Sequence, residues 1–112
     1  MAEQNLRLNI AKDYSRIVLG RWKRLGPFSG EDFYEKKLLP MYTTAVEQGV
    51  QLEIELDGTK GYPSSFLDQS FGELARNKGV DKVRTVIVFH ARVFQWVIKY
   101  INEEIWDKTA KV

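Results

Sequence analysis

The stretch Gln51–Gly79, QLEIELDGTKGYPSSFLDQSFGELARNKG, decides the fold. Its first residues alternate apolar and charged side chains, which places Leu52, Ile54 and Leu56 on one face of a predicted strand. Asp57-Gly58 ends that strand, and a loop with glycine, proline and two serines follows. The next apolar residues have helical spacing and lead to the closing glycine: Leu67, Phe71, Leu74 and Ala75. The centre of the chain is therefore a strand, a loop and a helix.

The residues before this stretch predict two strands and a helix. Leu6, Leu8 and Ile10 alternate with polar neighbours, as in a half-buried strand, and the apolar run 17–19 predicts a second strand. A helix is expected between Ser29, a suitable N-cap, and a glycine at position 49. Pro40 interrupts its pattern, either by kinking the helix or by starting a second helical piece.

The residues after the stretch predict one strand and one helix. The β-branched run 85–89 is typical of a strand covered on both faces. From Phe94 the apolar spacing predicts a helix that ends near Lys108. Alternating strands and helices favour a sheet with parallel pairs, and one domain accounts for residues 1–112.

Composition excludes several classes of function. The 112 residues are 44% hydrophobic and 29% charged, without cysteine, so disulfides, thiolate metal sites and a cysteine nucleophile are excluded. A net charge of +2 does not predict a nucleic-acid or membrane surface, and the basic run Arg21–Arg24 predicts a solvated loop. No apolar run has the length of a signal peptide or a membrane span. We expect a cytoplasmic protein without metal or cofactor.

Catalytic chemistry has few candidates in this sequence. His90, the one histidine, follows the run 85–89 without an evident carboxylate, cysteine or histidine partner. Ser64, His90 and Asp57 supply the residue types of a hydrolytic triad, but no G-x-S-x-G turn surrounds the serine. The segment Asp57–Gly61 has glycines and a lysine after a strand, without the spacing of a phosphate-binding loop. The residues therefore predict a protein that is not an enzyme.

The serine pair between loop and helix has two interpretations. Ser65 is followed three residues later by Asp68, as in a capping box, and Ser64 fits a helix that starts one residue earlier. A capping serine contributes about 1 kcal/mol of stability. The alternative is a phosphorylation switch, because backbone N–H groups at a helix start accept a phosphate while the surface charge changes sharply. The residues alone favour the cap and leave the switch open.

Several of these motifs are shared with known families. Across roughly residues 16–89 the chain resembles the STAS-like domain family of unknown function. The motifs that carry the likeness are Gly20-Arg21, Ser29-Gly30-Glu31, and Asp57-Gly58 through Ser65-Phe66-Leu67 to Phe71. The central stretch is also similar to STAS domains, the fold of bacterial anti-sigma factor antagonists. In that family a strand delivers a loop with paired serines, one of which is phosphorylated.

Carried over by position, the resemblance assigns the serine pair. Ser65 falls on the phosphorylated serine and Ser64 on its neighbour. Two positions depart from the pattern of the antagonists: Pro63 stands where they have an acid, and Phe66 stands where they have glycine.

The resemblance implies a fold and a function. The fold is a STAS-like α/β domain with a mixed sheet of four or five strands and helices mainly on one face. The function is that of a bacterial regulatory module that binds a protein, either an anti-sigma factor or a histidine-kinase-like ATPase, through segment 58–71. Ser65 or Ser64 would be the switch, and the expected binding residues are Asp57, Gly58, Lys60, Tyr62, Pro63 and Phe66.

Two alternatives to this function remain. The first is a structural or oligomerising module, including a homodimer, because Trp96, Tyr100 and Trp106 lie off the apolar stripe of the last helix. The second is a small enzyme with its site at the carboxyl ends of the strands, near Asp57 and His90.

Overall fold

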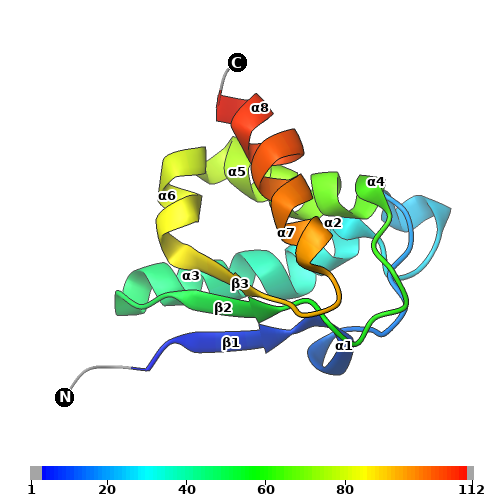
Figure 1. Cartoon of the computed structure of the whole chain (residues 1–112), viewed down its shortest axis with the longest axis horizontal. Helices are drawn as coiled ribbons and strands as arrows, with labels where there is room; N and C mark the ends of the chain where they lie inside the picture. Colours follow the sequence, from blue (N-terminus) through cyan, green and yellow to red (C-terminus); the bar gives the residue numbers. More distant parts are fainter. Residues whose placement is uncertain (1–3, 111–112) are drawn as a thin grey trace.

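The computed structural model describes residues 4–110, which contain one three-stranded sheet. Its strands are β1 (Leu6–Asn9), β2 (Leu52–Glu55) and β3 (Ile87–His90), with β2 in the centre and both pairs parallel. Figure 1 shows the three strands pointing the same way. The α/β class is confirmed, whereas the described residues form three parallel strands and not a mixed sheet of four or five.

The strand predicted at 17–19 is wrong. The chain turns directly after β1 into the short helix α1 (Ile10–Asp13), whose first carbonyl accepts the N–H groups of Tyr14 and Ser15. Within 17–19 only Val18 is buried, and the Leu19 N–H bonds to a carbonyl in the same long loop. The apolar run 17–19 therefore belongs to a loop that one buried valine, Val18, holds against the core, and not to a strand. The tip of this loop is the single turn Lys23–Leu25.

The strand predicted at 85–89 begins later, at Ile87. Residues before it form a helix, α6 (Val80–Val86), in which Val80, Val83 and Val86 are all buried. Their spacing of three keeps them on one helical face, so tertiary burial overrides the β-propensity of valine. The cover expected on both faces of this strand is also wrong, since Val88 is half-buried and His90 is exposed.

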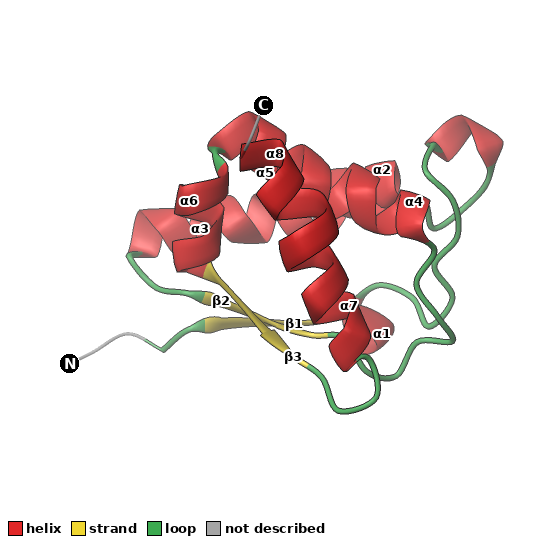
Figure 2. Ribbon diagram, turned by 45° about the horizontal axis from the view of Figure 1, so that its top comes forward, coloured by secondary structure: helices red, strands yellow, loops and turns green. Residues whose placement is uncertain are grey.

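The sheet has one apolar face and one polar face. The register places Leu6, Leu52 and Ile87 in one row, and Leu8, Ile54 and Phe89 in the next row on the same face. Figure 2 shows the long helices stacked over one side of the sheet. The other side stays open and carries the polar side chains of Arg7, Asn9, Glu53, Glu55 and His90.

Three long helical segments cover the apolar face, and each contains one wider, π-type turn. The first consists of α2 (Gly30–Phe33), the wider turn Tyr34–Leu38 and α3 (Leu39–Gln48). The second, which α6 follows, consists of α4 (Ser64–Leu67), the wider turn Asp68–Gly72 and α5 (Glu73–Lys78). The third consists of α7 (Gln95–Tyr100), the wider turn Ile101–Trp106 and α8 (Asp107–Ala110). None of the described helices is long and apolar enough to cross a membrane.

The first segment begins and ends as the sequence predicts. Ser29 is its N-cap, with the Oγ accepting the N–H of Asp32 at 3.0 Å, and Gly49 ends it with a left-handed φ of 71°. Pro40 neither breaks nor displaces the helix. The wider turn directly before it pairs the Leu39 N–H with the Tyr34 carbonyl, so the missing N–H of proline is accommodated.

A chain of aromatic rings joins the helices to the sheet. Phe33 lies 5.4 Å from Phe66 and 6.1 Å from Phe71, measured between ring centroids. Phe89 of β3 continues the chain, 5.2 Å from Phe71 and 5.6 Å from Trp106. The Trp106 indole N–H donates to the Phe71 carbonyl at 3.1 Å. Trp106 is therefore a core residue, although its position off the apolar stripe predicted otherwise.

The start of the first segment crosses the start of the second at a glycine. A Cβ at Gly30 would stand 2.6 Å from the Phe66 carbonyl oxygen and 3.0 Å from the Gln69 Cβ. This close approach holds the serine-bearing turn against α2, and only glycine permits it.

We expect Gly30→Ala to lower the free energy of unfolding by about 1–3 kcal/mol, because the new methyl group forces the two backbones apart. Gly20→Ala is the matched control, since nothing lies within 4 Å of its Cβ position. Urea unfolding followed by circular dichroism measures both. Equal stability of the two variants would contradict the tight crossing.

Candidate functional site

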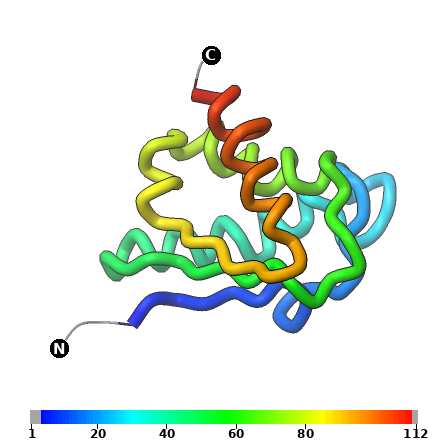
Figure 3. The backbone as a smooth tube through the Cα atoms, viewed as in Figure 1, coloured from blue at the N-terminus to red at the C-terminus, as the bar shows by residue number. Residues whose placement is uncertain are grey.

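The segments that follow the three strands meet at one end of the sheet. Because the strands are parallel, their carboxyl ends share an edge, and Figure 3 shows the chain leaving all three at that end. The three segments are α1, the loop 57–63 and the loop 91–94. This edge is where open α/β sheets commonly place their binding residues.

Asp57 joins two of these segments. Its carboxylate accepts the backbone N–H groups of Arg92 at 2.6 Å, Val93 at 3.1 Å and Phe94 at 3.1 Å. These donors, with that of Arg92 first, hold the pKa of the Asp57 carboxyl below its usual value. Since these residues directly precede α7, Asp57 fixes the loop that leads into the last helical segment.

Tyr62 folds the loop 57–63 back onto the sheet. Its hydroxyl donates to the Leu56 carbonyl at 2.6 Å, and its ring packs edge-on against Phe94 at 5.1 Å. Burial raises the pKa of Tyr62 to about 12. The middle of the loop is fixed as well, because the Lys60 N–H donates to the Arg16 carbonyl at 2.9 Å.

Gly58 makes the turn that starts this loop. Its φ is +105°, a conformation that side chains other than glycine rarely adopt. A Cβ there would also stand 2.9 Å from the Ala11 Cβ of α1. The loop and α1 are therefore in direct contact.

The serine pair lies in the first turn of α4, and the prediction that one serine is its N-cap is wrong. Pro63 occupies the N-cap position, with φ −61° and ψ 142°, and no side chain caps this helix end. Ser64 is exposed and Ser65 is half-buried. The fixed φ of proline starts the helix without a side-chain cap, so the first-turn N–H groups keep their capacity to bind an anion.

The structure divides the predicted site residues by exposure. Phe66 is fully buried beside Phe33 and Tyr62, and so belongs to the core. Tyr62 is also buried, while Asp57 and Ser65 are half-buried. The residues that present exposed surface are Gly58, Lys60, Pro63 and Ser64.

Arg21 is a site residue that local patterns did not identify. Its guanidinium donates to Asp68 at 2.7 Å and to Gln69 at 3.3 Å, both in the turn after α4. Burial opposes ionisation of Asp68, but the hydrogen bonds from Arg21 and Arg76 outweigh it and lower the pKa of the carboxyl. The Gly20-Arg21 motif was the available signal, and its role is to hold the helix that carries the serines.

His90 has a carboxylate partner that the sequence did not reveal. Its Nε2 lies 2.8 Å from Glu53 Oε1 on the open face of the sheet, at a hollow of about 410 Å³ that Arg7 and Glu55 also line. Glu53 also accepts a hydrogen bond from Asn5, and Asn5 and His90 together lower the pKa of Glu53. The outward positions of both residues on neighbouring strands were the available signal. Among the residues that line this hollow no serine, threonine, cysteine or tyrosine supplies a nucleophile.

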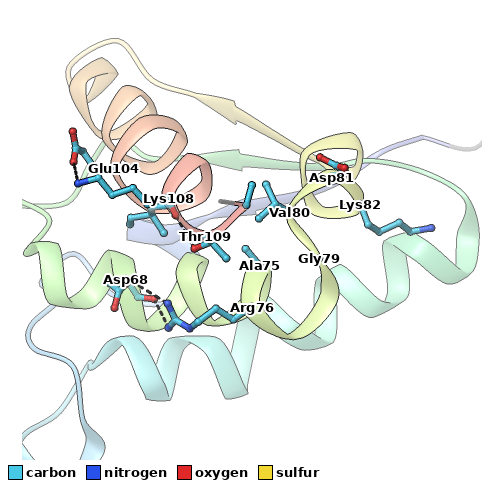
Figure 4. A pocket seen from close by; sticks show the side chains of 12 residues that line it. Asp68, Ala75, Arg76, Gly79, Val80, Asp81, Lys82, Glu104, Lys108 and Thr109 are labelled. Carbon is cyan, nitrogen blue, oxygen red and sulfur yellow. Dashed lines mark hydrogen bonds and ion pairs between the residues drawn. The ribbon is translucent and has the colours of Figure 1, made fainter. Parts of the chain in front are cut away.

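A hollow of about 730 Å³ lies between α5, α6 and α8. Figure 4 shows two ion pairs on its rim, with Arg76 turned to Asp68 and Lys108 turned to Glu104, while Lys82 extends away from the hollow. The inner side chains are small and apolar, such as Ala75 and Val80. No three potential metal ligands gather anywhere in residues 4–110. We assign no chemistry to this hollow.

Residues 29–91 match the sequence profile of a family described as a STAS-like domain of unknown function. The match begins at the N-cap Ser29 and includes Asp57, both serines and β3. No curated protein and no solved structure matches the chain.

We expect Asp57→Asn to lower the free energy of unfolding by about 1–2 kcal/mol at neutral pH, because an uncharged side chain accepts the three N–H groups of the loop 91–94 less strongly. The folded-state pKa of Asp57 is lowered, so its contribution is complete above the unfolded-state pKa of about 3.9 and is lost as the pH falls through the folded-state value. The difference between wild type and variant should therefore shrink in acid.

Urea unfolding at neutral pH and at about pH 3 measures this difference. Glu103→Gln is the control, because Glu103 is an exposed carboxylate in the middle of a helical segment. A loss for Asp57→Asn that stays constant with pH would show that the carboxylate charge does not stabilise the loop before α7.

Proposed function

The chain belongs to the family of STAS-like domains of unknown function, as its motifs indicated, and on that premise we propose that it is a regulatory protein-interaction module. The proposed module is not an enzyme and acts in the bacterial cytoplasm. It binds its partner through the surface around residues 58–65, and the serine pair controls this binding.

The observation that carries the proposal is the position of the two serines at the start of α4, where neither caps the helix. Pro63 takes the N-cap position, so neither serine is committed to capping α4. The Ser64 side chain is exposed, and both hydroxyl groups lie in the first turn of a helical segment that continues to Lys78. A third serine nearby, Ser70, is fully buried and donates to the Phe66 carbonyl at 2.7 Å, which leaves it no such role.

A phosphate at Ser64 or Ser65 has a physical place in this fold. The first N–H groups of a helix lack intrahelical partners and carry partial positive charge, so they stabilise an added anion. The phosphate contributes nearly two negative charges and leaves the core untouched. Binding of a partner to this surface would change while the domain stays folded.

The class of partner follows from the resemblance to STAS antagonists. We propose an anti-sigma factor or a histidine-kinase-like ATPase, which would bind the surface and phosphorylate a serine on it. The fixed loop supports this role, because hydrogen bonds through Tyr62 and Lys60 hold it in one shape and reduce the entropy that binding costs.

Self-assembly is the second candidate, and one observation favours it. Trp96 projects from the first turn of α7 with 53% of its surface exposed. Light scattering across a range of concentrations tests this candidate, and a strict monomer would contradict it.

We expect Ser64→Asp/Ser65→Asp to reduce recovery of the partner, because the added charges imitate phosphate at the binding surface. Wild type, this variant and Ser64→Ala/Ser65→Ala are compared by affinity capture from the native cell with quantitative mass spectrometry. Thr43→Asp, which adds a charge to the exposed surface of α3, is the matched control. Equal recovery with all four proteins would contradict the switch.

Phosphate mapping gives an independent check. Trypsin cleaves after Lys60 and Arg76, so Ser64, Ser65 and Ser70 fall in one peptide. We expect phosphate on Ser64 or Ser65 and none on the buried Ser70. A phosphate confined to Ser70 would contradict the assignment.

A further inference from the structure

We propose that the carboxyl end of the sheet binds an acidic segment of the partner, an inference that rests on the proposed function and gives its partner a chemistry. Four basic side chains surround this end and come from three stretches of the chain, residues 12–16, 57–63 and 91–94: Lys12, Arg16, Lys60 and Arg92. All four are exposed. None forms an ion pair with another residue of the described chain.

Backbone contacts bring these four residues together. Lys60 is tied to Arg16 through its N–H, and Arg92 is tied to Asp57 at the end of β2. Lys12, Arg16 and Asp57 line one hollow of about 380 Å³, which Gly58 also borders. The four cations therefore share one surface although 80 positions separate the first from the last (92 − 12).

Two carboxylates lie among these cations and keep their negative charge, but neither forms an ion pair with any of the four. The Asp57 carboxylate is occupied by three backbone N–H groups, and Asp13 Oδ2 accepts the Asn9 N–H at 2.8 Å. By contrast, the cations of Arg21 and Arg76 are both paired, since each forms an ion pair with Asp68. The cations at the sheet end are thus left for a ligand to pair with.

Apolar side chains stand beside the cations. Val93 is 73% exposed and Trp96 is 53% exposed, and the Trp96 ring packs against Phe94 at 6.4 Å. A tryptophan fixed by one neighbour and open on its other side is a typical anchor of protein interfaces. The surface therefore matches an acidic segment that carries an apolar or aromatic residue.

A peptide segment fits this surface better than a nucleic acid. Nucleic-acid binding draws its affinity from many phosphate contacts, typically about 6–10. Four cations and a net charge of +2 for the chain fall short of that number. Four cations suffice for a short acidic segment that also gains affinity from an apolar contact.

The serine pair follows this surface closely along the chain. Ser64 follows Lys60 by four positions, and the chain between them is held by the Tyr62 hydrogen bond. A phosphate there would lower the positive potential that attracts the acidic segment. Binding and its control would then act through the same charges.

The test uses a fluorescein-labelled acidic peptide, EEDFEELEE, and its basic counterpart, KKKFKKLKK, with fluorescence anisotropy and amide NMR spectra. We expect binding of the acidic peptide alone, weaker as salt increases, with amide shifts at residues 12–16, 58–64 and 91–96. The double variant Lys60→Glu/Arg92→Glu should raise the Kd about tenfold or more. Lys78→Glu/Lys82→Glu, two exposed lysines on α5 and α6, is the matched control and should change the Kd less than about twofold.

Several outcomes would overturn the inference. These are no binding of the acidic peptide, equal binding of the basic peptide, shifts confined to another surface, or stronger binding of a single-stranded oligonucleotide. Trp96→Ala should also raise the Kd about tenfold, and an unchanged value would remove the apolar contact from the proposal.

The inference and the proposed function fail in different ways. If Ser64→Asp/Ser65→Asp reduces capture of the partner but Lys60→Glu/Arg92→Glu does not, the switch stands and the acidic ligand is wrong. If only the charge reversal reduces capture, the basic surface stands and the switch is wrong.

Discussion

The alternation of side chains along β2 constrains the rest of the structure. Leu52, Ile54 and Leu56 are fully buried, whereas Glu53 and Glu55 between them lie on the open face. Parallel sheets usually carry cover on both faces, but two carboxylates on the central strand oppose burial of the second face. All helices must therefore gather on one side. Since the strands are parallel, the connecting segments must also leave the sheet at one end, which brings α1 and the loops 57–63 and 91–94 together.

Asp57 converts that shared end into a defined surface. Its carboxylate holds the loop after β3, and Tyr62 holds the loop after β2 through the neighbouring carbonyl. Both polar groups turn inward, where backbone groups of the protein itself occupy them. What remains outside is a rigid frame that presents Lys60, Pro63 and Ser64. A frame of this kind positions its exposed side chains before a partner arrives, which lowers the cost of ordering them.

Local patterns predicted the elements whose burial follows a regular period, such as β2, the helix capped by Ser29 and the helix ending at Gly79. These patterns gave wrong or incomplete predictions where the structure depends on contacts between residues far apart in the sequence. Residues 17–19 have the composition of a strand, but a pattern does not reveal whether a neighbouring strand is free to pair. The Asp57 clamp joins residues at least 35 positions apart, and the pair between Arg21 and Asp68 joins residues 47 positions apart. The serine cap failed for a local reason, because propensity favours serine while the backbone geometry of Pro63 already starts the helix.

The two positions that depart from the antagonist pattern, Pro63 and Phe66, both shape the first turn of α4. Phe66, where antagonists have glycine, fills the core beside Phe33 and fixes the first turn of α4 from the inside. Pro63, where they have an acid, starts that turn and leaves the serine hydroxyls outside. Without the acid, the residues that precede the serine pair include the apolar ring of Pro63 and, four positions before Ser64, the cation of Lys60. The same two substitutions therefore leave the serine hydroxyls outside the core and make Lys60 the nearest charged residue before them in the sequence.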